Sequence, residues 1–237
     1  MNENEAESKP QIELRDKLRY ETLKALAVQG KASFLVSIIN GAIVYLVLEP
    51  IVGRQIMLFW LAILITLTII RVLMISGFFR LDEHDVKHGS WQMAFVFLAF
   101  ASAACWGALP LLLDFSDTQW ASTFVIFVVS GMSAGALVSL YAMINVVIPY
   151  LMIMLFPLLY VVASTPNPAA LGMALLTGFY LLILVRSAYT MNASFRKTLR
   201  LELENEELFD FLINARHDPE KRLADVNRDK FWTGYDI

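Results

Sequence analysis

Six long apolar runs occupy most of this 237-residue chain and constrain its fold more than any other feature. Each run has roughly 18 to 24 residues, which at about 1.5 Å per helical residue is enough to cross a bilayer core of about 30 Å. The predicted spans are residues 32–49, 55–75, 91–113, 119–142, 146–164 and 169–190. Connections between them are short, so successive helices are expected to pack antiparallel. The sequence therefore predicts an all-α membrane protein, a six-transmembrane helical bundle.

The composition excludes several other classes of protein. With 57% hydrophobic and 17% charged residues, the chain is too apolar for an ordinary soluble domain. The polar segments 1–31 and 191–237, which flank the predicted membrane domain 32–190, are too short to bury a catalytic core. A net charge of −3 offers no basic face for nucleic acid. We therefore expect a protein of the lipid bilayer that is not an enzyme and has no catalytic residue, metal or cofactor.

The distribution of Lys and Arg predicts the orientation of the spans. If the N-terminus lies inside, Arg54 is the one basic residue near a span end that falls outside. Both termini are therefore predicted to be cytoplasmic in a multi-pass protein of a bacterial inner membrane. The acidic start of the chain resembles no cleavable signal peptide, so the first span is expected to act as a signal-anchor. Cys105 lies inside a span and is expected to pack as a small apolar residue.

The polar ends of the chain carry amphipathic patterns. From Gln11 onward, mixed apolar and basic residues predict a helix on or just beneath the membrane surface. A solvated lead-in to the first span is the alternative, because Glu13, Asp16 and Glu21 lie in the same stretch.

The C-terminal segment is predicted to be a cytoplasmic signalling helix that continues from the sixth span. Leu201, Leu208 and Ala215 are seven residues apart, and Asn205 and Leu212 fill the alternate positions. This spacing fits either two heptads of a parallel coiled coil, with Asn205 setting the register, or a single amphipathic helix. An interruption is expected at residues 217–219, which contain Pro219, followed by a second helix to about residue 230.

Small residues recur every fourth position in two spans. Ala99, Ala103 and Gly107 form one ridge, and Gly131 and Gly135 form another. Such ridges let helix backbones approach closely in lipid. We expect them to pack within the bundle, with a homodimer interface as the alternative.

The polar residues near the middle of the spans are the candidate binding groups. They comprise hydroxyls and one amide, with no charged side chain or histidine among them, which argues against an ion-coupled carrier. Asn40 is the costliest to leave unpaired in lipid, so it is expected to face another helix or a ligand. The predicted ligand-binding residues are Asn40, Trp106, Ser130 and Tyr180. Trp106 could wall a pocket beside the helix bend at Pro110, although a purely structural kink is the preferred interpretation there.

Charged residues near the spans have simpler interpretations. Arg71 and Arg186 lie slightly inside the predicted inner interface and are expected to extend to the headgroups as topology anchors. His84 and His88 are four residues apart among carboxylates, which is a zinc-like spacing, but a solvated charge cluster is the preferred interpretation.

Several segments together resemble the membrane-embedded sensory region at the N-terminus of bacterial hybrid histidine kinases and some diguanylate cyclases. The similar segments are Thr68–Arg71, Trp91, Cys105–Pro110, Ser130–Leu137 and Leu201–Leu208, within residues 11–231. The resemblance implies a sensory bundle whose last helix leads to an output domain. The phosphorylatable histidine box, the ATP-binding lid and the cyclase motif of those families are absent from this sequence, so their catalysis does not carry over.

The sequence therefore predicts a sensor-like signalling module without its own catalytic domain. A small apolar ligand or a bilayer change is expected to act on the bundle, and a cytoplasmic kinase, cyclase or response regulator is expected to read the tail. The alternatives are a small-molecule facilitator or carrier and a scaffold that recruits a separate kinase.

Overall fold

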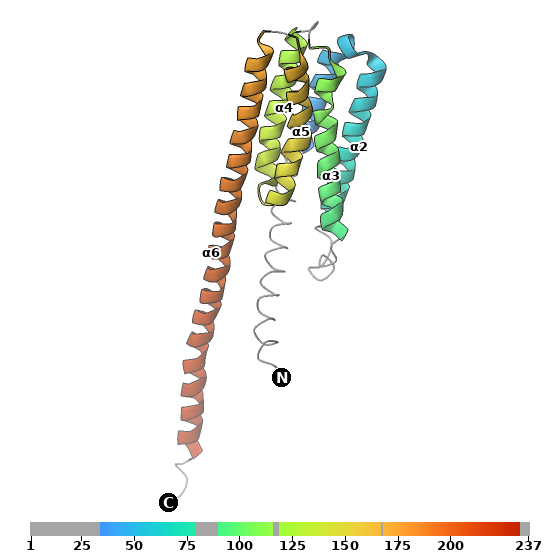
Figure 1. Cartoon of the computed structure of the whole chain (residues 1–237). Coiled ribbons are helices and arrows are strands. Elements are labelled where there is room, and N and C mark those ends of the chain that lie inside the picture. The colour runs from blue at the N-terminus through green and yellow to red at the C-terminus, as the bar shows by residue number, and fades with distance from the viewer. Residues whose placement is uncertain (1–33, 79–89, 116–118, 167, 233–237) are drawn as a thin grey trace, which may run out of the picture. The chain divides into compact units, whose positions relative to one another are not determined.

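The computed structural model describes residues 34–78, 90–115, 119–166 and 168–232. Within these ranges the chain is helical and contains no strand, and six helices are long and apolar enough to cross a membrane (Figure 1). They are the first span (Phe34–Val52), α2 (Arg54–Phe78), α3 (Ser90–Gly107) with the 3₁₀ turn η1 (Leu109–Leu112), α4 (Gln119–Leu140), α5 (Ile144–Ser164) and α6 (Ala170–Trp232). Each predicted span falls on one of these helices, which confirms the all-α, six-helix prediction. The predicted N-terminal surface helix and the pair His84 and His88 lie outside the described residues.

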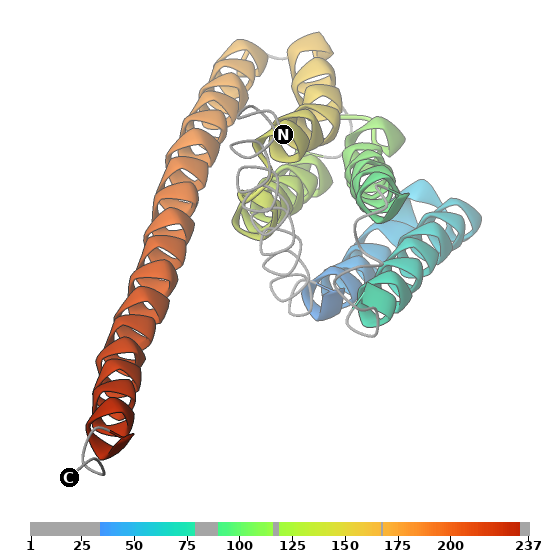
Figure 2. The same ribbon diagram turned by 90° about the horizontal axis from the view of Figure 1, so that it is seen from below.

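The chain divides into two compact units, Met1–Asn192 and Ala193–Ile237. In the first unit α3 packs against both α2 and α5, and α5 also packs against α4 (Figure 2). The first span joins the bundle through Gly41, where a Cβ atom would lie 2.5 Å from the Leu64 side chain of α2. In the second unit the described residues 193–232 form the C-terminal part of α6.

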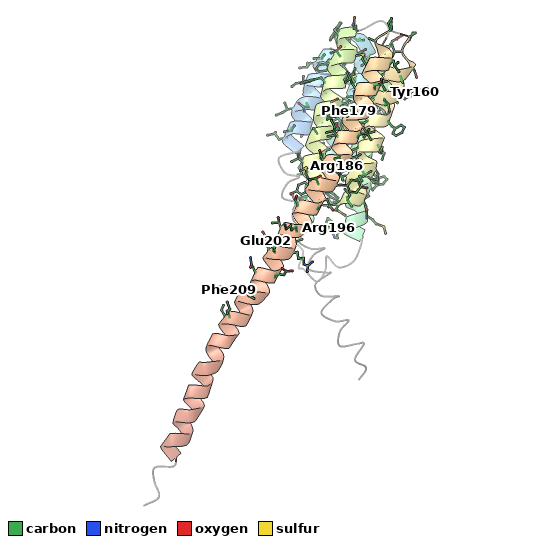
Figure 3. All side chains as sticks on the ribbon, turned by 60° about the vertical axis from the view of Figure 1, so that its left-hand side comes forward. Tyr160, Phe179, Arg186, Arg196, Glu202 and Phe209 are labelled. Atoms are coloured by element: carbon green, nitrogen blue, oxygen red, sulfur yellow. The ribbon has the colours of Figure 1, made fainter. Side chains whose placement is uncertain are left out.

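The packing of the first unit is that of a protein surrounded by an apolar medium. Its core contains fully buried side chains such as Trp106, Leu151 and Met154. Its outer surface is also apolar, with Phe127 79% exposed and Phe179 of α6 62% exposed (Figure 3). A monomeric soluble protein rarely exposes so much apolar surface, whereas lipid tails cover it without cost.

The connection from the first span to α2 is one residue long. The helix extends through Pro50 to Val52, so the loop predicted over residues 50–54 is shortened to Gly53. Gly53 has a φ of 102°, a left-handed conformation that favours glycine, and its N–H donates to the Glu49 carbonyl at 3.0 Å. The two helices therefore form a tight hairpin.

The two predicted ridges of small residues behave differently. Ala99, Ala103 and Gly107 of α3 are buried, and a Cβ atom at residue 107 would lie 2.7 Å from the Ile153 carbonyl oxygen of α5. This ridge is confirmed as a packing surface. Gly131 and Gly135 of α4 are exposed, with nothing within 4 Å of an added Cβ atom, so the expectation that they pack within the bundle is wrong.

The predicted interruption at residues 217–219 is also wrong. The helix α6 continues from Ala170 through Pro219 to Trp232. A proline removes one N–H donor from a helix, and the flanking Ala, Arg, Glu and Lys residues all favour helical backbone. The residues on both sides of the proline therefore favour the helix that the structure shows.

Candidate functional site

Two of the predicted binding residues meet where α4 contacts α6. The Tyr180 hydroxyl of α6 donates to the Ser130 carbonyl oxygen of α4 at 2.6 Å. The Ser133 hydroxyl donates to the same carbonyl at 2.8 Å and lies 3.1 Å from the Tyr180 hydroxyl. We call Ser130, Ser133 and Tyr180 the α4–α6 junction.

The junction lies near the middle of α4 and near the middle of the predicted sixth span, residues 169–190. Ser130 is eleven residues after the start of α4 at Gln119, and Tyr180 is ten residues after the start of α6 at Ala170. At about 1.5 Å per residue, both lie roughly 15 Å along their spans. Hydrogen bonds at this depth have no water to compete with them, so they favour one register of α6 against α4.

Asn40 of the first span contacts α4 at Met132, next to Ser133 in sequence. Its Nδ2 atom donates to the Met132 sulfur at 3.2 Å, and the side chain is half-buried. Asn40 therefore faces another helix, which was one of its two predicted surroundings. A ligand role for Asn40 stays a prediction.

Trp106 lies between α3 and α2, whereas the other three predicted residues lie on α4 or contact it. It is fully buried and packs edge to face on Trp60 of α2, with ring centroids 5.4 Å apart and an interplanar angle of 81°. The Trp60 indole N–H donates to the Cys105 carbonyl at 2.8 Å. That carbonyl lies in the last turn of α3, where helical carbonyls lack intrahelical donors, and Pro110 in the following 3₁₀ turn marks the predicted bend.

The Trp106 indole N–H is buried and has no hydrogen-bond acceptor among the described residues. An indole N–H in a buried site ordinarily has an acceptor. This donor is consistent with the predicted pocket wall, and its role in binding stays a prediction.

Asn192 is a structural contact that sequence reasoning missed. Its Nδ2 atom donates to the carbonyl oxygens of Tyr141 at 2.7 Å and Ala142 at 2.9 Å, and the side chain is 6% exposed. These carbonyls follow the end of α4, so Asn192 fastens α6 to the turn between α4 and α5. An asparagine just beyond the predicted end of the sixth span was the available signal, but its partner depends on tertiary packing.

The two membrane arginines differ in their surroundings. Arg186 is exposed on α6 (Figure 3), and its role as an anchor stays a prediction. Arg71 is half-buried, and its guanidinium carbon lies 5.8 Å from the Phe34 ring centroid and 5.3 Å from that of Phe95. Two aromatic rings therefore lie beside its guanidinium. The predicted extension of Arg71 to the headgroups stays a prediction.

The chemistry of the described site is that of hydrogen bonding and packing. The α4–α6 junction contains hydroxyls and a backbone carbonyl, without an ionisable acid or base suited to proton transfer at neutral pH. In the described part of the chain, no group of three or more His, Cys, Asp or Glu residues is placed to hold a metal ion.

Comparison with known proteins gives no relative. No family model matches the chain, and no curated protein or solved structure matches it. The class of protein therefore rests on its helices. Six helices that are long and apolar enough to cross a membrane, with an apolar outer surface, indicate a multi-pass α-helical membrane protein.

Proposed function

We propose that this chain is a sensor-like signalling module of a bacterial inner membrane, with both termini cytoplasmic. A small apolar ligand, or a change in the bilayer, alters the packing of the spans, and a cytoplasmic partner reads the change from the C-terminal helix. The observation that carries the proposal is the continuity of α6. One unbroken helix extends from Ala170, through the α4–α6 junction, to Trp232.

The proposed input acts on the contacts that hold α6. Tyr180 and Asn192 attach this helix to α4 and to the turn after it. A ligand that competes for the Ser130 carbonyl, or that changes the position of α4, alters the rotation or height that these hydrogen bonds favour. Because a helix is stiff over several turns, the change passes along the backbone rather than being absorbed in a loop.

The proposed output surface is a short parallel coiled coil with a second copy of the chain. Leu201 and Leu208 take d positions, and Asn205 and Leu212 take a positions. Leu201, Leu208 and Leu212 are each at least 50% exposed in the single chain, so their apolar surface favours a partner helix. An asparagine at an a position favours a dimer in one register.

Insertions after Arg196 test whether helical phase carries the signal. Two inserted residues turn the following helix by about 200°, whereas seven turn it by about 700°, close to two whole turns. Tagged full-length variants are cross-linked in native membranes, and kinases, cyclases or response regulators that co-purify are identified and assayed for activity. The proposal expects the two-residue insertion to change the activity of the bound partner and the seven-residue insertion to restore it.

Truncation at Arg196 is the companion experiment. A partner that is lost on truncation, and whose activity depends on phase, supports a signalling subunit. A partner that binds the tail but is indifferent to phase indicates the scaffold instead. The absence of any tail-dependent partner contradicts both and leaves the facilitator, for which substrate flux in vesicles is the direct assay.

A further inference from the structure

Arg71 is a cation held against the membrane bundle without a protein anion to neutralise it in the described residues. It lies on α2, seventeen residues after Arg54, in the same half of the bundle as Phe34 at the start of the first span. Its Nε atom is inaccessible to solvent and has no hydrogen-bond partner among the described residues. A guanidinium in hydrocarbon is costly unless it is paired, so the position calls for a counter-ion.

The helices around Arg71 do not supply this counter-ion. Across the described parts of the first span, α2, α3 and α5, the one carboxylate is Glu49. Glu49 is fifteen residues after Phe34, which places it about 22 Å away along the first span. The Tyr150 hydroxyl interacts electrostatically with Arg71 and hydrogen-bonds with Ser102, but a phenol does not neutralise an arginine at neutral pH.

The Arg71 side chain nevertheless keeps some accessible surface. Arg71 as a whole is half-buried, although its Nε atom is inaccessible to solvent. The exposed side chains that flank Arg71 around α2 are apolar: Ile70 is 43% exposed and Val72 is 39% exposed, each about 100° from Arg71 around the helix. A charged centre is therefore bordered by a surface suited to an acyl chain.

We propose that Arg71, with the Phe34 and Phe95 rings beside it, binds an oxyanion, a phosphate or carboxylate, with the acyl chain of an amphiphile lying on the adjoining apolar surface. A guanidinium binds such groups through two parallel N–H···O contacts, which a lysine does not reproduce. The rings stabilise the cation by cation–π attraction and shield it from water. This site is separate from the α4–α6 junction, and its existence does not depend on the signalling proposal.

The direct test measures the melting temperature of the purified full chain in dodecyl maltoside. Dodecyl phosphate supplies the oxyanion with a tail, inorganic phosphate supplies it without one, and dodecyltrimethylammonium supplies the tail with the opposite charge. Arg186→Gln is the matched control, because Arg186 lies sixteen residues after the start of α6, at nearly the same distance along its span, but is exposed.

Dodecyl phosphate at a hundredfold excess over its Kd is expected to raise the melting temperature of the wild type and of Arg186→Gln by roughly 5 °C. Arg71→Gln is expected to lose this rise. If the melting temperature rises with dodecyl phosphate but not with inorganic phosphate, the ligand is a membrane amphiphile. If both raise it equally, the ligand is a water-soluble oxyanion. An unchanged response of Arg71→Gln, or an equal response of the wild type to the cationic amphiphile, overturns the proposal.

Two further variants keep the test decisive if Arg71→Gln does not fold. Arg71→Met removes the charge while keeping an apolar stem, and it is expected to be at least as stable as the wild type without added anion. Arg71→Lys keeps the charge and is expected to bind dodecyl phosphate about tenfold more weakly. Equal affinity of the wild type and Arg71→Met for dodecyl phosphate contradicts the proposal.

The carboxylates at positions 82, 83 and 85 provide the last control. Asp82→Asn, Glu83→Gln and Asp85→Asn are combined in one full-length variant, and the lipids that co-purify from native membranes are measured by mass spectrometry. The proposal expects this variant to retain its anionic lipid. In Arg71→Gln the amount of co-purified anionic lipid is expected to fall about tenfold or more. The opposite result would assign the counter-ion to the protein. In that case the wild type binds no anionic lipid, and the triple variant is less stable than the wild type.

Discussion

The backbone of Gly107 lies against the carbonyl oxygen of Ile153, which is the oxygen that Pro157 leaves without an intrahelical donor. Pro157 lacks an N–H group, so the carbonyl four residues earlier is free. Membrane helices tolerate proline where a neighbouring helix covers such a carbonyl. A glycine in α3 permits the approach, and the two residues together bring α3 and α5 into close contact.

Substitution of Gly107 is predicted to destabilise the bundle. In Gly107→Ala the added Cβ atom would lie 2.7 Å from the Ile153 oxygen and 3.1 Å from the Met154 Cα, both backbone atoms that cannot rotate away. Overpacking of this kind costs about 1–3 kcal/mol. Unfolding in mixed detergent micelles measures the loss, with Gly131→Ala as control. Because nothing lies within 4 Å of that site, the control is expected to be neutral or up to about 1 kcal/mol more stable, and equal losses would contradict the packing.

Removal of the Tyr180 hydroxyl is predicted to loosen α6 from α4. Tyr180→Phe keeps the ring but loses the 2.6 Å hydrogen bond to the Ser130 carbonyl, at a cost of about 0.6 to 1.7 kcal/mol. Tyr189→Phe, at a tyrosine 57% exposed on the same helix, is expected to cost less. A double-mutant cycle with Ser133→Ala measures the coupling between the two hydroxyls. Strict additivity would show that Ser133 and Tyr180 act independently.

Asn192 is predicted to be the stronger attachment of α6. Asn192→Ala leaves the carbonyls of Tyr141 and Ala142 without this amide donor and is expected to cost about 1–3 kcal/mol. Ser194→Ala, two residues further at an exposed position, is the matched control and is expected to change stability little. If the signalling proposal holds, Asn192→Ala also changes the activity of the tail-bound partner. Stability equal to that of the control would contradict the role of Asn192.

The single cysteine reports on the integrity of the Trp60–Trp106 pair. Cys105 is 8% exposed, and Trp60 covers its backbone carbonyl, so a maleimide is expected to label the native chain slowly and the unfolded chain rapidly. Trp60→Phe removes the indole donor and is expected to accelerate labelling, whereas Trp120→Phe, at a tryptophan 59% exposed on α4, leaves the rate unchanged. Rapid labelling of the folded wild type would contradict the described burial.

The spans could be predicted from sequence because bilayer thickness fixes the length of an apolar helix. The ridge of Ala99, Ala103 and Gly107 could be predicted for a related reason, since small residues are needed where backbones approach in lipid. The same logic failed for Gly131 and Gly135. Spacing identifies a smooth helix face, but it does not identify the neighbour that the face contacts.

The contacts of the candidate site depend on tertiary pairing that one sequence does not encode locally. The meeting of Ser130 with Tyr180 joins residues fifty positions apart, and so does the contact between Asn192 and Ala142. Ser130 and Tyr180 could be predicted as candidates because their hydroxyls lie near the middle of a span. Asn192 lies beyond the predicted sixth span, so the same reasoning did not select it. At Pro219, a local rule gave the wrong boundary, since α6 continues through the proline to Trp232.

Two hydroxyl protons serve three oxygen–oxygen contacts in the α4–α6 junction. The hydroxyls of Ser133 and Tyr180 carry one proton each, and they serve three oxygen–oxygen contacts with each other and with the Ser130 carbonyl. One contact is therefore without a proton at any moment. Rotation of a hydroxyl about its C–O bond exchanges one arrangement for another while the backbone stays in place. The hydrogen bonds between the two helices thus have more than one arrangement, and a single added donor or acceptor would favour one of them.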